Sequence, residues 1–231
     1  MSHAVPVIAI DGPSGAGKGT VARRVAAALG FHTLDSGALY RLVGLSALRD
    51  QVALTDEPAL VQLTLALQLR FDQSPTGAQR IWLDEQDVTE AVRSEAAGLR
   101  ASQVAALPSV RAALVTRQRA CAVVPGLVAD GRDMGSMIFP NAALKIFLTA
   151  STEERAQRRL AQLQAQTTPA DLATVTADIV RRDHQDATRA VAPLRPWPDA
   201  VQIDTTGVPV DAVVARVLQL AVDRGIPTSR G

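Results

Sequence analysis

Short runs of consecutive apolar residues alternate along the chain with stretches in which apolar residues recur every three or four positions. The first pattern predicts strands buried on both faces, and the second predicts helices that bury one side. The predicted strands are Val5–Ile10, Phe31–Leu34, Leu127–Ala129, Leu144–Leu148 and Val201–Ile203. The predicted helices include Lys18–Leu29, Glu57–Leu69, Ser109–Val123 and Val210–Val222. This alternation indicates an α/β fold, a five-stranded parallel sheet with helices on both faces.

Between residues 69 and 93 the sequence departs from this alternation. Short β-like pieces, Arg80–Leu83 and Asp87–Thr89 among them, replace the helical spacing, and Ser-Pro-Thr-Gly at 74–77 is typical of a turn. We predict a small antiparallel insertion attached to the α/β core. Trp82 is expected to pack in the core of this insertion rather than to serve as a platform for a ligand.

The composition is that of a globular protein. The chain has 231 residues, of which 47% are hydrophobic and 20% are charged, and its net charge is +1. This balance leaves no overall excess of positive charge with which the chain could bind nucleic acid or an anionic membrane. Cys121 is the only cysteine, which excludes a disulfide framework and a thiol metal site. No apolar run reaches membrane-spanning length and no signal peptide is evident, so we expect a cytoplasmic enzyme. We also expect the protein to be a monomer.

A glycine-rich loop with a lysine lies between the first predicted strand and the first predicted helix. This is the context of a phosphate-binding P-loop, in which backbone N–H groups turn inward around the phosphates. The positive end of the helix dipole adds to the attraction, and Lys18 can reach the β- and γ-phosphates. The ATP-binding residues that we predict are Gly12, Pro13, Ser14, Gly15, Ala16, Gly17, Lys18, Gly19 and Thr20.

One position in this loop departs from the general motif. Gly19 follows the lysine where the motif has a serine or threonine that binds magnesium, and Thr20 comes one residue later. This argues against a typical GTPase or motor ATPase, and the loop resembles that of nucleoside monophosphate kinases. The spacing also excludes a dinucleotide-binding fingerprint, because Gly15, Gly17 and Gly19 run as GxGxG.

Charged residues follow the strand predicted at Leu127–Ala129. Asp130 ends it, where a carboxylate can hold Mg²⁺ directly or through water beside a P-loop; the alternative is a cap of the strand end. Arg132 and Asp133 come at the open end of the sheet, where ligands bind in such folds, and a surface ion pair is the alternative. Arg41 lies about one turn inside the helix that follows the strand predicted at Phe31–Leu34. It could clamp a second phosphate together with Arg132, or lie in solvent.

Arginines cluster on two helical segments on either side of an irregular stretch at 165–170. Spacings of three and four residues put members of each cluster on one helix face. A solvated face is the plain interpretation. The stretch between the clusters looks like a flap, however, and a closing lid needs cations to neutralise the transferring phosphoryl group and exclude water. The clusters contain Arg155, Arg158 and Arg159, and then Arg181, Arg182 and Arg189.

Several strings of residues together resemble bacterial cytidylate kinases, and the resemblance covers nearly the whole chain. They are Ile10–Thr20, Leu34–Gly37, Ala101–Ala105, Ala129–Gly135, Arg182–Asp183 and Ala190–Leu194. The resemblance implies a kinase that transfers the γ-phosphoryl group of ATP to CMP or dCMP with Mg²⁺. It also implies an extra β-rich insertion in the monophosphate-binding region, which fits the segment at 69–93.

The resemblance implies a single P-loop kinase domain with three regions. The core takes residues 1–36, 124–154 and 190–231. The monophosphate-binding region takes residues 37–123, and a short lid takes residues 155–189. ATP and CMP or dCMP are the expected partners, with neither nucleic acid nor a membrane among them.

The resemblance also assigns roles to individual residues. Cytosine would be read by Ser102, Arg111 and Asp133, and the CMP phosphate would be clamped by Arg41 and Arg132. The other implied CMP-binding residues are Ser36, Arg182, Asp186 and Arg189, the last three on the lid side. The implied catalytic residues are Lys18, Arg132, Arg182 and Arg159. Between Arg182 and Arg189 the chain is less basic than is usual in the family.

Two other functions fit parts of this pattern. One is a P-loop kinase for another acceptor, such as UMP, AMP or a metabolite hydroxyl. The other is a nucleotide-gated switch, which would hydrolyse slowly and release no ADP in response to an acceptor. The absence of an Asn-Lys-x-Asp string weighs against a GTP switch.

Overall fold

The computed structural model describes residues 5–73, 79–165, 169–189 and 192–227. The chain divides into two compact units, residues 1–35 with 119–231 and residues 36–118, and each is described by itself. Outside the described residues lie the predicted turn at 74–77, residues 166–168 of the irregular stretch, and residues 190–191 of the string that starts at Ala190. The division into core, monophosphate-binding region and lid stays a prediction.

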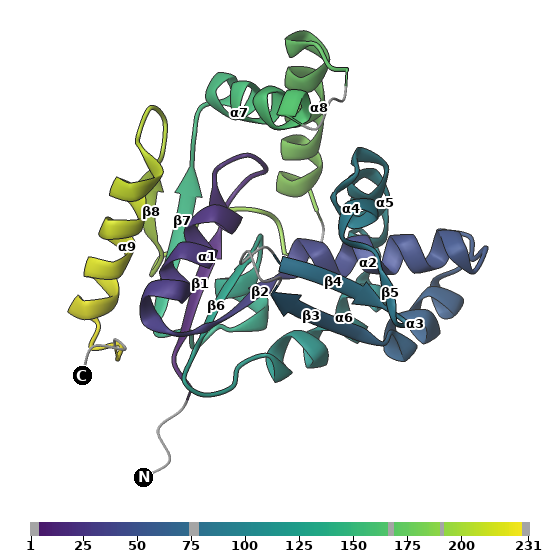
Figure 1. Cartoon of the computed structure of the whole chain (residues 1–231), viewed down its shortest axis with the longest axis horizontal. Coiled ribbons are helices and arrows are strands. Elements are labelled where there is room, and N and C mark those ends of the chain that lie inside the picture. Colours follow the sequence, from purple (N-terminus) through teal and green to yellow (C-terminus); the bar gives the residue numbers. More distant parts are fainter. Residues whose placement is uncertain (1–4, 74–78, 166–168, 190–191, 228–231) are drawn as a thin grey trace. The chain divides into compact units, whose positions relative to one another are not determined.

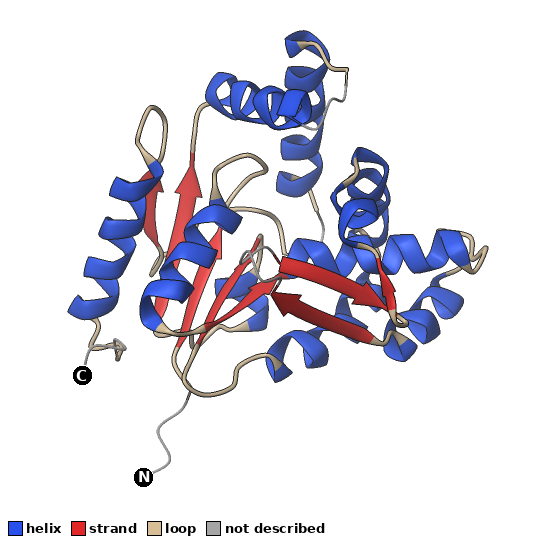
Figure 2. Ribbon diagram, viewed as in Figure 1, coloured by secondary structure: helices blue, strands red, loops and turns tan. Residues whose placement is uncertain are grey.

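The first unit is built on a five-stranded sheet with the order β2-β6-β1-β7-β8, drawn as red arrows in Figure 2. Its strands are β1 (Val7–Asp11), β2 (His32–Asp35), β6 (Leu127–Gly131), β7 (Leu144–Thr149) and β8 (Val201–Asp204). Every pair of neighbouring strands is parallel. The predicted five-stranded parallel sheet is therefore confirmed.

Burial differs between the centre and the edges of this sheet. Every residue of β1 and β6 is buried, as expected for strands covered on both faces. At the edges, Leu34 is the buried residue of β2, and β8 alternates between half-buried and exposed positions. The prediction of burial on both faces is wrong for these two strands, which lie at the edges of the sheet, where its faces are less completely covered.

Helices α1 (Lys18–Leu29) and α9 (Val210–Asp223) pack against each other beside the sheet (Figure 1). The bounds of α1 are those predicted, and Gly30 ends the helix in a left-handed conformation. The apolar faces of both helices join the strands in the main core, with Val25, Val217, Ile8, Ile146 and Leu148 among its members. This core fixes β1 and α1, and thereby the two ends of the P-loop.

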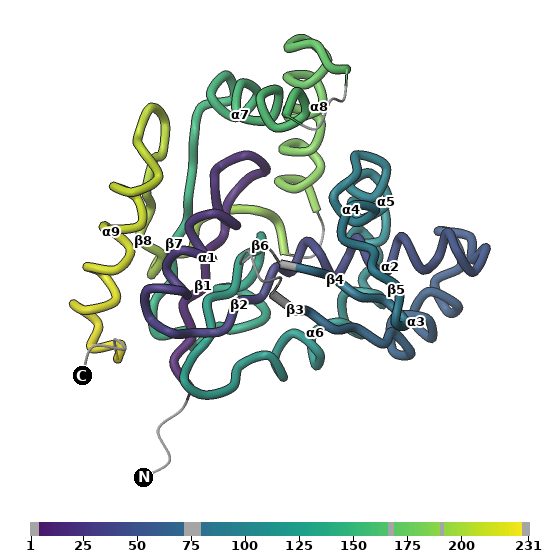
Figure 3. Tube along the Cα trace, viewed as in Figure 1, coloured from purple at the N-terminus to yellow at the C-terminus, as the bar shows by residue number. Residues whose placement is uncertain are grey.

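Two helices, α7 (Thr152–Ala165) and α8 (Leu172–Ala187), lie beside each other after β7, and Figure 3 traces the chain through them toward β8. They share a small core formed by Ala156, Leu163, Val175 and Ile179. A short π-helical turn, η1 (Met134–Ile138), follows β6 and contacts β1.

The second unit combines helices with a small antiparallel sheet. Its helices are α2 (Ser36–Arg49), α3 (Glu57–Ala66), α4 (Thr89–Arg93), α5 (Glu95–Ala105) and α6 (Pro108–Ala120), the last of which belongs to this unit as far as Gln118. Its strands are β3 (Leu69–Gln73), β4 (Gln79–Leu83) and β5 (Gln86–Asp87), in that order. Both strand pairs are antiparallel, so the predicted insertion is confirmed.

Several predicted boundaries in this part of the chain are wrong. The helix predicted at Glu57–Leu69 ends at Ala66, because Leu69 opens β3. The piece at Asp87–Thr89 is not one strand, since the Asp87 side chain accepts hydrogen bonds from the N–H and hydroxyl of Thr89 and thereby turns the chain into α4. Helix α6 begins at Pro108 and ends at Ala120 rather than running over Ser109–Val123.

Trp82 is not the buried centre of the insertion. Its neighbours Ile81 and Leu83 are buried, whereas Trp82 is half-buried on β4. Alternation along a strand places it on the opposite face from these two residues. There the Arg70 guanidinium of the paired strand lies 4.6 Å from the centre of the indole ring. Trp82 thus packs under an arginine, and the aliphatic pair forms the buried centre.

Candidate active site

The P-loop joins the buried end of β1 to the start of α1. Gly12 has a φ of +150°, and a Cβ at this position would lie 2.1 Å from the carbonyl oxygen of Leu148. Only glycine allows this approach. Gly17 caps α1 in a left-handed conformation without any side-chain hydrogen bond. The first N–H groups of the helix therefore remain available for an anion, as a phosphate-binding loop requires.

Lys18 begins α1 and folds back over the loop. Its Nζ donates a hydrogen bond to the carbonyl of Pro13 at 2.8 Å. Burial, followed by the charge of Arg132, lowers the pKa of Lys18 below its ordinary value. A polyphosphate in the loop would supply the negative charge that favours the protonated amine, so the position suits a lysine that binds phosphate.

Asp130 lies on β6, next to Asp35 on the neighbouring strand β2. It is buried, and burial together with the Asp35 carboxylate raises the pKa of Asp130. A Cβ at Gly19 would lie 3.0 Å from Asp130 Oδ2. The departure from the general motif at Gly19 therefore leaves space beside this carboxylate. Within the described ranges, no group of three or more His, Cys, Asp or Glu side chains could hold a metal ion.

Three of the predicted CMP-binding residues meet in the first unit. Asp186 on α8 is buried, and its carboxylate accepts hydrogen bonds from Arg132 Nε and from Arg189. Arg132 extends from the end of β6, and Arg182 lies one turn before Asp186 on the same helix. We call Arg132, Asp186 and Arg189 the arginine–aspartate cluster. It holds two guanidinium groups in place around one anion, a geometry that also suits a phosphate.

Asp11 is a site residue that the sequence analysis missed. Its two carboxylate oxygens accept hydrogen bonds from the backbone N–H groups of Met134 and Gly135, each at 2.8 Å. These bonds fasten the turn that follows Arg132 and Asp133 to the end of β1. The sequence offered one indication of its importance, because Asp11 is an acidic residue that ends an apolar strand directly before a glycine loop.

The Asp11 carboxyl makes stability depend on pH. Burial raises the pKa of Asp11 from its ordinary value of 3.8 to about 6. The folded protein favours the protonated form of this carboxyl, whereas the unfolded chain ionises it more easily. The stabilisation that the protonated carboxyl contributes to the free energy of unfolding is therefore lost as pH rises from about 4 to about 6. Asp11→Asn removes the titration. The free energy of unfolding of the variant should therefore rise relative to the wild type by about 3 kcal/mol across this window.

Urea unfolding of both proteins at a series of pH values measures this difference. Above pH 7 the wild-type carboxyl is ionised in both the folded and the unfolded state, so the difference should become constant there. A difference that stays constant between about pH 4 and about pH 6 would contradict the assignment.

The arginines of α7 bind protein groups. Arg155 is buried and bonds Ser14 of the P-loop and Asp183 of α8. Arg158 bonds the hydroxyl and the carbonyl of Thr205. Arg159 NH1 lies 3.3 Å from Gln162 Oε1 on the same helix. The catalytic role of Arg159 stays a prediction.

The second unit holds the other predicted CMP-binding residues. Ser36 is buried at the start of α2, and Arg41 on that helix donates to the carbonyl of Val92 at 2.8 Å. Ser102 lies on α5, where its hydroxyl donates to Gly98. Arg111 on α6 donates to the carbonyl of Ala105 and lies 5.8 Å from the ring of Tyr40. Arg111 therefore contacts the end of the helix that carries Ser102.

The predicted clamp and the predicted base-reading set each combine residues of both units. Arg41 belongs to the second unit and Arg132 to the first. Ser102 and Arg111 likewise belong to the second unit, and Asp133 to the first. The spatial meeting of these residues stays a prediction.

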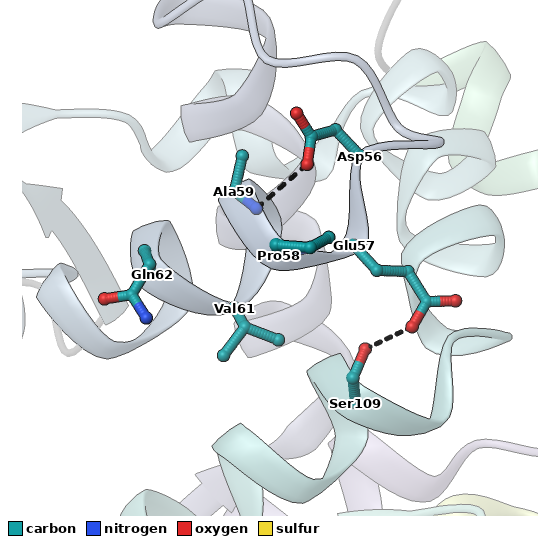
Figure 4. Close-up of a pocket in the computed structure, with 7 residues that line it drawn as sticks. All are labelled: Asp56, Glu57, Pro58, Ala59, Val61, Gln62 and Ser109. Atoms are coloured by element: carbon teal, nitrogen blue, oxygen red, sulfur yellow. Dashed lines mark hydrogen bonds between the residues drawn. The ribbon is translucent and has the colours of Figure 1, made fainter.

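A separate pocket lies within the second unit, at the start of α3 (Figure 4). None of the predicted site residues lines it. The side chain of Asp56 caps α3 by accepting from Ala59, and Glu57 accepts a hydrogen bond from Ser109 at 2.6 Å. Its remaining lining residues are Pro58, Val61 and Gln62. Its charged side chains are both carboxylates, so this pocket does not suit a phosphate.

The P-loop on a parallel sheet, with arginines gathered beside it, defines a P-loop protein of the phosphotransferase class. The chain belongs to the cytidylate kinase family, because the family model described as cytidylate kinase matches residues 8–223. The cytidylate kinase of Stutzerimonas stutzeri (strain A1501) is 52% identical over 98% of this chain and 99% of that protein. The cytidylate kinase of Chromobacterium violaceum is 55% identical over 93% of this chain and 95% of that protein.

A solved structure, that of TT1252 from Thermus thermophilus, is 19% identical with a TM-score of 0.47, over 95% of this chain and 97% of that chain. Among the described residues, no helix has both the length and the apolar character needed to cross a membrane.

Proposed function

We propose that the protein transfers the γ-phosphoryl group of ATP to the phosphate of CMP or dCMP, forming ADP and CDP or dCDP. The observation that carries the proposal is the P-loop with Lys18 in the same unit as the arginine–aspartate cluster. One element suits the polyphosphate of a donor, and the other suits the phosphate of an acceptor. The cytidylate kinases that match nearly the whole chain support cytidine nucleotides as the acceptor.

The proposed reaction requires no general base. The attacking atom is a phosphate oxygen of CMP, and this phosphate is largely dianionic at pH 7 because its second pKa is about 6. Catalysis then consists of aligning two polyanions and stabilising their charge. A site of one lysine and several arginines provides those functions.

Each residue of the site has a proposed task. Lys18 binds the β- and γ-phosphates of ATP, and the backbone N–H groups of the P-loop hold the phosphate chain. Arg132 binds the acceptor phosphate and stabilises the charge of the transferring group. Arg182 and Arg159 add positive charge from the lid side. Arg189 and Asp186 complete the acceptor site together with Ser36 and Arg41.

The residues present fit a hydrated Mg²⁺ ion, which ATP-dependent kinases use. Asp130 and Asp35 stand on paired strands, and burial raises the pKa of Asp130, so a cation beside this carboxylate would stabilise its ionised form. Gly19 leaves the adjoining space open. Asp130 would hold the ion, directly or through water, and Mg²⁺ would neutralise phosphate charge there.

Ser102, Arg111 and Asp133 are proposed to select cytosine over uracil. Position 4 of cytosine carries an amino donor, whereas uracil carries a carbonyl acceptor. The Asp133 carboxylate can only accept, so it suits the amino group and repels the carbonyl. Arg111 and Ser102 can donate to O2 and N3 of cytosine, where uracil presents an N3–H group. Mismatched polar groups would be left buried and unpaired, so the protein should prefer CMP to UMP by about 10³-fold in kcat/KM.

Asp133→Asn tests this selection, because the amide can donate as well as accept. The ratio of kcat/KM for CMP to that for UMP should narrow, chiefly because CMP is used less well. The KM for ATP is the internal control and should not change. If the ratio is unchanged in a folded variant, Asp133 does not read the base.

The function itself is tested by ADP release with ATP and each of CMP, dCMP, UMP and AMP in turn. We expect rapid release with CMP or dCMP and little release without an acceptor, because the site should exclude water as the acceptor. Fast turnover of UMP or AMP alone would indicate a kinase for another acceptor. Slow hydrolysis that no acceptor accelerates would indicate a nucleotide switch.

We also propose that the protein is a monomer and that it acts in the cytoplasm. Light scattering after gel filtration tests its oligomeric state.

A further inference from the structure

Arg155, near the start of α7, is buried and fully engaged with other protein groups. Its Nε donates to the carbonyl of Ala150 at 3.1 Å, and its NH1 donates to the carbonyl of Ser14 at 3.1 Å. NH1 and NH2 also bind the two carboxylate oxygens of Asp183 at 3.0 and 2.6 Å, and NH2 lies 3.2 Å from Thr152 Oγ1. An arginine has five N–H groups, and these five contacts provide an acceptor for each of them.

One side of this arginine is in direct contact with the P-loop. Ser14, which accepts from Arg155, lies in the middle of the loop. The next residue, Gly15, has a φ of +81°, and a Cβ there would lie 2.9 Å from the Cβ of Arg155. The loop backbone therefore rests on the stem of Arg155 as well as on its guanidinium. A change in the conformation of the loop at this point must be accommodated by Arg155.

A second arginine holds α7 in the same place. Arg158, one turn further along, donates to the hydroxyl of Thr205 at 3.0 Å and to its carbonyl at 2.6 Å. Thr205 is buried, and its hydroxyl lies 3.3 Å from the carbonyl of Ala16 in the P-loop. Helix α7 is thus connected to the loop at two positions, and Arg155 has a well-defined orientation.

The other side of Arg155 reaches the residues proposed to bind the acceptor. Asp183, which binds both NH1 and NH2, follows Arg182 directly on α8 and precedes Asp186 by one turn. Asp186 in turn bonds Arg132 and Arg189. A single guanidinium therefore connects the loop proposed to bind ATP with the helix proposed to bind CMP.

We propose that Arg155 and Asp183 form a positioning pair that couples ATP binding in the P-loop to CMP binding by α8. The proposal rests on the proposed function. Because one guanidinium bonds both elements, a loop arrangement favoured by ATP also favours the arrangement of α8 that keeps those bonds. Bound ATP should then strengthen CMP binding, and bound CMP should strengthen ATP binding by the same factor.

The coupling can be measured by titration calorimetry of CMP into the whole protein, with and without saturating Mg²⁺ and a non-hydrolysable ATP analogue. In the wild type we expect the analogue to tighten CMP binding by about 5–150-fold, the usual range of coupling between sites. Asp183→Asn keeps the size of the side chain but removes its charge and one acceptor. The variant should lose most of this enhancement while still binding CMP alone. A merely structural role would weaken binding equally with and without the analogue.

The matched control is Asp178→Asn, on the same helix. Asp178 forms an exposed ion pair with Arg181, whereas Asp183 is half-buried and binds the buried Arg155. Its replacement should leave the enhancement at the wild-type value. Arg155→Lys keeps the positive charge but cannot bind Ser14 and both oxygens of Asp183, so it should lose the enhancement as Asp183→Asn does. The double variant should lose no more than either single variant.

Full enhancement in folded Asp183→Asn or in folded Arg155→Lys would overturn the proposal. So would the absence of any enhancement in the wild type. These outcomes are distinct from failure of the proposed function, which would appear as wild-type protein that releases no ADP in response to CMP.

Discussion

Lys18→Ala is expected to lower the rate of phosphoryl transfer by about 10²–10³-fold, the usual effect of removing one preorganised electrostatic contact from a transition state. The contact should be valuable because Lys18 is partly buried and already directed over the loop by its hydrogen bond to Pro13. Steady-state ADP release at saturating CMP measures the effect, and circular dichroism establishes that the variant is folded.

Arg24→Ala is the control for this experiment. It removes a positive charge from the same helix, but Arg24 is exposed and pairs with Asp211 at the surface, so its loss should change the rate little. Near-normal turnover of Lys18→Ala would refute the role of the loop in phosphoryl transfer.

The second large effect is expected at Arg132. Its side chain is 25% exposed and bonds the buried Asp186 carboxylate, so it presents a fixed charge at the end of β6. Arg132→Met should lower kcat/KM for CMP by about 10²–10³-fold, because it removes a charge proposed to bind both the acceptor and the transferring group. Arg132→Lys retains the charge but not the planar fork, and should recover only part of the activity.

Arg181→Met controls for the loss of an arginine. Arg181 is exposed on α8 and pairs with Asp178, so its replacement should leave kcat/KM for CMP close to the wild-type value. Thermal unfolding of Arg132→Met separates a catalytic effect from a loss of stability. The variant should remain folded, because Asp186 keeps its second partner, Arg189. Wild-type kcat/KM in folded Arg132→Met would contradict the proposed site.

The elements that sequence reasoning found are those determined by local patterns. The helix at Lys18–Leu29 was predicted with its observed bounds, because the glycine loop and Gly30 limit it on both sides. Strand cores were also found, although β1 begins at Val7 and continues to Asp11. The error at Leu69 arose because pairing with Leu83 draws this residue into a strand, and such pairing is not encoded within a local window.

In the site, as in the fold, sequence reasoning found the parts that are contiguous in the chain and missed the contacts between distant residues. The P-loop and Lys18 are contiguous in sequence and could be assigned from their spacing alone. The bonds of Asp11 to Met134 and Gly135 join residues 123 and 124 positions apart, so spacing gives no indication of them. Arg155 is comparable, because periodicity places it on a helix face but does not show that Ser14 and Asp183 lie beside it.

Sequence patterns alone are therefore enough to identify the α/β alternation, the phosphate-binding loop and the family of the chain, since each depends on residues that are close together or on strings that match. Only the folded chain shows that Asp186 bonds Arg132 and Arg189, that Asp11 fastens the turn after Arg132, and that Arg155 connects the loop to α8. A buried charge is stable only beside a partner, and packing can supply that partner from any distance along the chain.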